Sequence, residues 1–133
     1  MRYISHFAIV VHDYDEAIAF YTEKLGFELA EDTPLSPTKR WVRVRPPGSE
    51  CSVLLARADQ PEQSAVVGRQ AGGRVWLFLY TDDFEAEHQR LLDNGVTITR
   101  PAVDEPWGRV LVFADLYGNQ WDLIQPPVSQ RGQ

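Results

Sequence analysis

The sequence predicts an α+β fold made of two tandem strand–helix–strand–strand–strand (βαβββ) modules. Three observations lead to this prediction: the order of elements repeats, the two candidate helices share identities, and a polar segment separates the halves. An offset of 69 residues superimposes four identical pairs, namely Asp13 on Asp82, Glu16 on Glu85, Ala17 on Ala86 and Gly26 on Gly95. A repeated order of elements with identities at a fixed offset indicates an internal duplication.

The predicted duplication sets the domain organisation. The 133 residues suffice for one domain. We therefore expect a single domain over 1–133 that is divided into four parts. These are module 1 at about 3–56, a linker at 57–73, module 2 at about 74–126 and a frayed tail at 127–133.

Module 1 begins with a predicted strand at 3–11, which is rich in β-branched and aromatic residues. Asp13 precedes Glu16 by three positions, which is the spacing of a capping box at a helix start. Apolar residues then follow at helical spacing until Gly26, which predicts the helix end. Three further strands are predicted at 27–31, 40–45 and 52–56, with a Pro-Pro-Gly turn between the last two.

The second half repeats this pattern after a polar segment. Residues 57–73 carry few large apolar side chains and end in Gly72-Gly73, which is typical of a linker and also compatible with a mobile lid. A strand is predicted at 74–81, followed by a helix that Asp82 and Glu85 cap and Gly95 ends. Strands at 97–100, 109–114 and 120–124 complete the module, with the last hairpin turn at 117–119.

Composition narrows the class of protein. The net charge of -6 argues against nucleic acid or an anionic membrane as the main partner, because both attract basic surfaces. No apolar run approaches a membrane-spanning length, so we expect a soluble, cytoplasmic protein with no membrane partner. The lone Cys51 excludes an intrachain disulfide and any CxxC metal knuckle.

Two segments carry a family resemblance. HFAIVVHDYDEAIAFYTEKLGF near the start and DLYGNQWDLIQP near the end resemble the vicinal oxygen chelate superfamily, the group of glyoxalase I, bleomycin-resistance proteins, fosfomycin-resistance enzymes and extradiol dioxygenases. The resemblance covers residues 3–126. It implies a cup-shaped mixed sheet with helices on its outer face, a ligand pocket between the modules, and a homodimer. Members catalyse different reactions or sequester a drug, so the fold does not settle the function.

The resemblance also identifies candidate metal ligands. In metal-using relatives these lie on the first and last strands of each module, which corresponds here to His6 and Asp122. The other two positions hold side chains that cannot ligate: Val53 or Leu54, and Val75 or Trp76. Catalytic zinc normally keeps three protein ligands. We therefore expect no cofactor. If a divalent metal is bound after all, His6 and Asp122 are the residues expected to hold it.

Strand alternation extends the candidate site. If His6 and Asp122 point into the cup, their strand neighbours of the same parity line it. The predicted ligand-binding residues are Trp41, Arg43, Leu54, Trp76, Phe78, Tyr80 and, in the loop before the seventh strand, Trp107. Aromatic side chains suit a planar or cationic ligand, and arginine suits a carboxylate or phosphate. The alternative for Trp41 and Trp107 is a subunit interface, where tryptophan is also enriched.

Three functions are compatible with these residues. The first is a metal-free protein that binds a small, aromatic or anionic molecule. The second is a glyoxalase-like lyase, isomerase or transferase, or a dioxygenase, in which His6 and Asp122 serve as catalytic acid and base or as partial metal ligands. The third is a dimeric interaction module with a vestigial cup. His6 and Asp122 meet either within one chain or across the predicted dimer.

Overall fold

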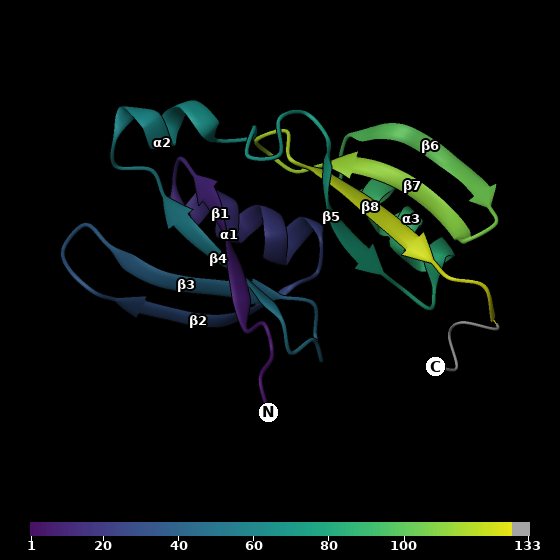
Figure 1. Ribbon diagram of the computed structural model, residues 1–133, viewed down its shortest axis with the longest axis horizontal. Coiled ribbons are helices and arrows are strands. Elements are labelled where there is room, and N and C mark those ends of the chain that lie inside the picture. Colours follow the sequence, from purple (N-terminus) through teal and green to yellow (C-terminus); the bar gives the residue numbers. More distant parts are fainter. Residues whose placement is uncertain (129–133) are drawn as a thin grey trace. The chain divides into compact units, whose positions relative to one another are not determined.

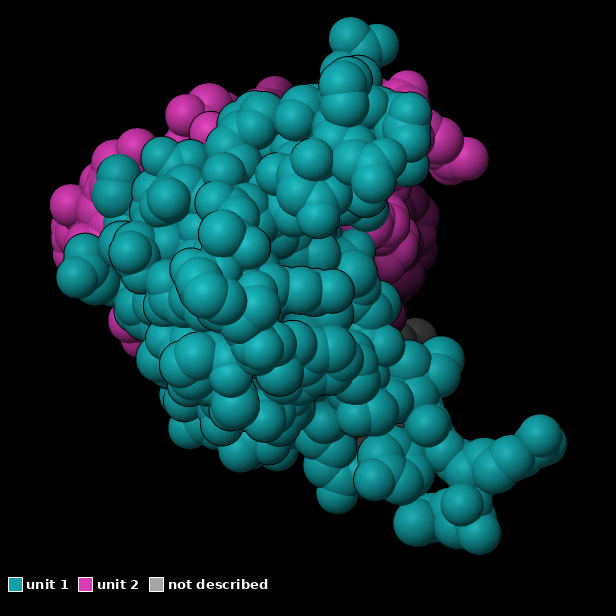
Figure 2. Space-filling view, turned by 90° about the vertical axis from the view of Figure 1, so that its left-hand side faces the viewer, with its two compact units in different colours: residues 1–70 teal, residues 71–133 magenta. Residues whose placement is uncertain are grey.

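The computed structural model describes residues 1–128, and the expected tail falls mostly outside the described residues. The chain divides into two compact units, Met1–Gln70 and Ala71–Gln133, which Figure 2 colours separately. Each unit holds one four-stranded mixed sheet and follows the βαβββ order (Figure 1). The predicted α+β class with two tandem βαβββ modules is confirmed.

The first unit comprises β1 (His6–Val11), α1 (Tyr14–Ala19), the π-helical η1 (Phe20–Lys24), β2 (Glu28–Pro34), β3 (Arg40–Arg45), β4 (Ser52–Arg57) and α2 (Pro61–Val66). Its strands lie in the order β1-β4-β3-β2. β1 runs parallel to β4, whereas β3 is antiparallel to both β4 and β2. β1 and β2 are therefore the edges of this sheet.

Alternation along these strands separates a core face from a second face. The buried residues Ile9, Val11, Val42, Val44, Val53 and Leu55 alternate with partly exposed ones. α1 contacts β3 and β4, and its Ala17 is fully buried. The buried set therefore forms the core under the helix. The opposite face of each sheet, away from α1 or α3, is called the front face below.

The second unit comprises β5 (Val75–Tyr80), α3 (Phe84–Asp93), β6 (Ile98–Glu105), β7 (Gly108–Ala114) and β8 (Gln120–Gln125), with strand order β5-β8-β7-β6. α3 contacts β8 and buries Phe84 and Leu91. Phe113 and Trp121 stack with ring centroids 6.0 Å apart. The second unit thus repeats the first, with a stacked aromatic pair in its core.

The two main helices begin one residue out of register with the predicted repeat. Asp13 caps α1, since its Oδ2 accepts a hydrogen bond from the Glu16 N–H at 2.9 Å. The predicted cap Asp82 is wrong: Asp83 Oδ1 instead accepts from the Ala86 N–H at 3.2 Å. The structural offset is therefore 70 residues at the helix starts and 69 at the glycines that end them, Gly26 and Gly95.

The extra residue of the first helix is absorbed in η1. The Leu25 N–H donates to the Phe20 carbonyl, five positions earlier, at 3.2 Å. Such a π-helical turn holds one more residue than an α-helical turn. The helix thus keeps its ends in place although it is one residue longer than its counterpart.

The segment predicted as a linker contains the helix α2, which the sequence analysis did not predict. Pro61 at its first position and Glu62 in its first turn are helix-start signals within a polar stretch. The flanks of α2 bind β1 on its two edges, because Ala58 continues the ladder between β1 and β4 whereas Gln70 lies along the free edge. Ala58 N–H donates to the Val11 carbonyl at 2.8 Å, and the Gln70 side chain accepts from the Val10 N–H at 2.7 Å.

The edge strands β2 and β6 are longer than predicted. β2 extends to Pro34, and β6 reaches Glu105 with Pro101 inside it. Proline is tolerated on edge strands because its missing N–H faces away from the ladder. Among residues 1–128, no helix combines the length and the hydropathy needed to cross a membrane.

Candidate functional site

Four predicted site residues share the front face of the first sheet. Leu54 of β4 lies directly opposite Arg43 of β3. The Trp41 indole and the His6 imidazole meet edge to face, with ring centroids 5.6 Å apart. Because β4 lies between β1 and β3, the indole reaches across β4 to make this contact. The structure therefore brings His6, Trp41, Arg43 and Leu54 together within one unit.

The surroundings of Arg43 differ from those of a free anion-binding group. Its Nε donates to Glu31 at 3.0 Å and its Nη1 donates to the Ser52 hydroxyl at 2.9 Å. A bulge in β2 between Leu29 and Glu31 shifts the strand register and places Glu31 opposite Arg43. Simple alternation from the start of β2 does not place Glu31 on this face. The sequence pattern therefore does not reveal Glu31 as the carboxylate that neutralises Arg43.

A cleft of about 450 Å³ lies at the end of this sheet where β1 and β4 finish and β3 begins. This volume is within the range of about 300–1,000 Å³ that is usual for ligand pockets. Front-face residues contribute its apolar part, the loop after β2 and the start of α2 contribute its sides, and cationic groups lie around it. The lining residues are Val10, Tyr14, Ser36, Thr38, Lys39, Arg40, Trp41, Leu54, Leu55, Ala56, Arg57, Asp59 and Gln63.

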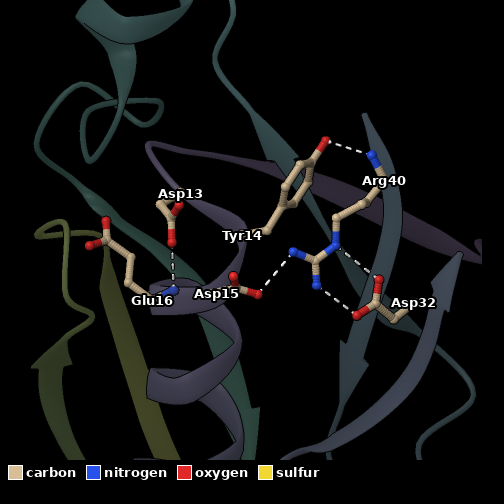
Figure 3. Close-up of polar contacts among 6 residues, drawn as sticks. All are labelled: Asp13, Tyr14, Asp15, Glu16, Asp32 and Arg40. Atoms are coloured by element: carbon tan, nitrogen blue, oxygen red, sulfur yellow. Dashed lines mark hydrogen bonds and ion pairs between the residues drawn. The ribbon is translucent and has the colours of Figure 1, made fainter. Parts of the chain in front are cut away.

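A polar network fastens one side of the cleft (Figure 3). Arg40 donates to Asp32 through Nε at 3.1 Å and Nη2 at 2.7 Å, and to Asp15 through Nη1 at 2.9 Å. Its backbone N–H donates to the Tyr14 hydroxyl at 3.1 Å. The hydrogen bonds from the Arg40 guanidinium lower the pKa of Asp32. The same guanidinium is bound by two carboxylates, and these hydrogen bonds raise the pKa of Arg40. The network thus ties the β2–β3 hairpin to the start of α1.

The remaining predicted residues belong to the second unit. Asp122 of β8 lies opposite Phe78 of β5 and Val112 of β7. Burial raises the pKa of Asp122, and the charge of Arg100 opposes this shift. Phe78 is 61% exposed. Asp122 and Phe78 therefore pair a partly buried carboxylate with an exposed aromatic ring.

The other aromatic residues of this unit are less regularly placed than predicted. A register shift between Val75 and Leu77 places a bulge at Trp76, so strict alternation along β5 is interrupted. Tyr80 lies opposite Ile124 and is 67% exposed. Trp107 occupies the turn between β6 and β7 and is also exposed.

The turn that precedes β8 is held by Asp115. Its Oδ1 accepts from the N–H groups of Tyr117 and Asn119, both at 2.9 Å, and its Oδ2 accepts from the Asn119 side-chain amide at 2.9 Å. Asp115 and Asn119 are both buried. This part of the sequence motif shapes the turn, and thereby sets where β8 and its Asp122 begin.

Comparison with known proteins identifies the family. Residues 3–123 match the family model of the Glyoxalase/Bleomycin resistance protein/Dioxygenase superfamily. The chain belongs to this superfamily. It is 56% identical, over 124 residues and 92% of each chain, to an uncharacterized protein of Shewanella frigidimarina (strain NCIMB 400).

Two solved structures of similar proteins share the fold. UcmS2 has a TM-score of 0.81 and 34% identity, covering 93% of this chain and 98% of that one. TnmS3, an antibiotic binding protein from Streptomyces sp. CB03234, has a TM-score of 0.78 and 33% identity, covering 96% and 98%. The family resemblance and the tandem βαβββ architecture are thus both supported independently of the strand assignments.

The candidate metal ligands of this superfamily member are distributed over both units. His6 belongs to the first unit, and its Nδ1 lies 3.0 Å from the Ser5 hydroxyl. Asp122 belongs to the second unit. Within each unit, over residues 1–128, no three His, Cys, Asp or Glu side chains are grouped so that they could hold a metal ion.

Proposed function

We propose that this protein binds a small molecule, aromatic or anionic in character, in the cleft at the end of its first sheet and without a complete metal site. The observation that carries the proposal is the cleft of about 450 Å³ beside Trp41 and Leu54. Apolar walls with a few polar groups are the usual composition of a ligand pocket. The similarity to an antibiotic binding protein, at 33% identity over 96% of this chain, supports the same function.

Trp41 is the residue on which we expect a planar ligand to stack. It lines the cleft, and its indole is already held on one side by the edge-to-face contact with His6. A side chain that is fixed before the ligand arrives loses less conformational entropy on binding. The proposal therefore assigns Trp41 a direct contact and His6 the role of positioning the indole.

A thermal-shift screen against planar aromatic compounds, aromatic acids and thiol conjugates tests this function. A ligand at one hundred times its Kd adds about 2.7 kcal/mol to the free energy of unfolding. We expect stabilising compounds in the panel, and a smaller stabilisation in Trp41→Ala than in the control Leu92→Ala, which removes an exposed side chain of α3. No stabilisation of the wild-type protein by any compound would contradict the proposal.

The alternative function is a glyoxalase-like lyase or isomerase, or a dioxygenase, that uses His6 and Asp122. The raised pKa of Asp122 favours it, because proton-transfer groups often have shifted pKa values. Elemental analysis of protein purified without chelator separates the two: stoichiometric nickel, zinc or iron would overturn the metal-free proposal. A turnover of any bound compound that His6→Ala abolishes, with binding retained, would establish the enzyme.

We also propose that the protein is a homodimer, as the superfamily resemblance implies. Exposed aromatic side chains such as Tyr80 and Trp107 are typical of subunit interfaces as well as of ligand sites. Light scattering coupled to size-exclusion chromatography measures the molar mass directly. A mass near the 15.2 kDa of one chain would contradict the dimer.

A further inference from the structure

Three cationic side chains line the cleft of the first unit, although the chain as a whole carries a net charge of -6. Lys39, Arg40 and Arg57 line the cleft, together with the single carboxylate of Asp59. Arg40 is neutralised by Asp15 and Asp32, as described above. Among residues 1–128, no ion pair joins Asp59, Lys39 or Arg57 to an oppositely charged group. Arg40 with its two carboxylates carries a net charge of -1, whereas Lys39 and Arg57 remain as two cations that no carboxylate of the described residues binds.

Arg57 is held in place by uncharged partners. Its guanidinium carbon lies 5.7 Å from the centroid of the Tyr14 ring. Its Nη2 donates to the Thr38 carbonyl at 2.6 Å. A guanidinium has five N–H donors, so this bond leaves others for a ligand. Arg57 is therefore a positioned cation with donors to spare and no carboxylate of its own.

Arg43, the arginine predicted to bind an anion, differs from Arg57 in that a carboxylate of the protein already binds it. Arg43 is paired with Glu31, so a ligand acid at Arg43 would compete with a carboxylate that is already there. Arg57 offers its charge without such competition, because its contacts are to a ring face and a carbonyl oxygen. An acidic ligand is therefore better served by Arg57 than by Arg43.

We propose that the cleft of the first unit binds a planar aromatic acid. The ring lies on Trp41, and the acidic group is bound by Arg57 with the assistance of Lys39. This inference rests on the proposed small-molecule binding and deepens it by naming the class of ligand. Trp41 and Arg57 line the same cleft. The guanidinium fork matches the oxygen pairs of carboxylate and phosphate alike, so the shared chemistry is an aryl group bearing an oxyanion.

The test uses three probes that share one ring system: 2-naphthoate, 2-naphthyl phosphate and the neutral 2-naphthamide. Each is titrated into the full-length wild-type protein and into Arg57→Gln, with binding followed by NMR chemical shifts. We expect both acids to bind the wild type more tightly than the amide. Arg57→Gln should weaken the acids about tenfold, equivalent to about 1.4 kcal/mol, and leave the amide unchanged. The tighter of the two acids identifies the preferred oxyanion.

Two further variants control for charge and for folding. Arg69→Gln removes the same charge from an exposed position of the same unit outside the cleft, so it should bind all three probes like the wild type. Lys39→Gln removes the second unneutralised cation without breaking any of the contacts of Arg57 described above. It should weaken the acids by a smaller factor than Arg57→Gln, and this variant remains informative if Arg57→Gln fails to fold.

The outcomes separate this inference from the proposed function. Equal affinity of acids and amide in the wild type would overturn the inference while small-molecule binding stands. The same is true if the acids bind Arg57→Gln and Lys39→Gln as tightly as they bind the wild type. If none of the three probes binds, the aromatic-acid inference is overturned, and the broader thermal-shift panel alone then decides the proposed function.

Discussion

The double contact between Arg40 and Asp32 predicts a measurable coupling energy between these side chains. Two hydrogen bonds join them, at 3.1 and 2.7 Å, and the side chains are only 28% and 29% exposed. Fully exposed ion pairs contribute about 0.2–1 kcal/mol, and a bidentate, half-buried pair lies at the upper end of that range. We expect a coupling of about 1 kcal/mol at pH 7. Arg40→Gln, Asp32→Asn and the double variant complete the cycle.

The coupling should depend on pH with a definite sign. Because the hydrogen bonds of Arg40 lower the pKa of Asp32 in the folded state, the pair stabilises the protein fully above the unfolded pKa of about 3.9. The contribution is lost as the pH falls through the lower, folded pKa, where Asp32 becomes protonated. Arg40 remains charged throughout. The coupling should therefore shrink between pH 7 and strongly acidic conditions.

Urea unfolding followed by tryptophan fluorescence measures the free energy of unfolding of the four proteins of the cycle, at pH 7 and again in strongly acidic solution. The matched control is the Arg45–Glu28 pair, which makes one contact at 2.7 Å and is more exposed, at 36% and 42%. Its coupling should be smaller. A coupling between Arg40 and Asp32 below about 0.3 kcal/mol at pH 7, within the error of additivity, would refute the reasoning. So would a coupling that is unchanged in acid.

Three other predictions concern single residues. Because burial raises the pKa of Asp122, Asp122→Asn should increase the free energy of unfolding at pH 7, and the difference should close toward pH 3.5; a decrease at pH 7 would contradict this. Gly108→Ala places a Cβ directly against the Gln125 carbonyl oxygen, at φ +145°. It should cost about 2 kcal/mol, more than Gly48→Ala, where φ is +84° but no atom lies within 4 Å. Asp115→Ala removes three hydrogen bonds of a buried turn and should cost about 3 kcal/mol; a loss under about 1 kcal/mol would show that water replaces them.

The parts of the fold that depend on local signals could be predicted from the sequence. Asp13 and Gly26 bound the first helix because capping and a left-handed glycine act within a few residues. The second cap was misplaced by one position because Asp82 and Asp83 are adjacent and identical. Sequence identity then favoured the offset of 69, whereas the longer first helix makes the structural offset 70 at that point.

The candidate site could be predicted only in part, because its electrostatics depend on pairings between strands. Alternation correctly separated Trp41 and Arg43 from the buried Val42 and Val44. It could not reveal that a bulge places Glu31 opposite Arg43. Arg57 was assigned to the linker, since nothing in its neighbours marks it as the last residue of β4 or as a partner of Tyr14. Contacts of this kind depend on tertiary packing rather than on local pattern.

The fastening of the segment around α2 has a consequence for how the chain can be lengthened or cut. Ala58 and Gln70 both bond to β1, so the stretch between them is a loop with two fixed ends on one strand. An insertion between these anchors only enlarges the loop, and loop closure entropy grows slowly with length. A fragment ended at residue 57 would instead leave the N–H of Val10 unpaired on an open edge, which invites pairing with another chain. A soluble version of the first half should therefore extend through Gln70.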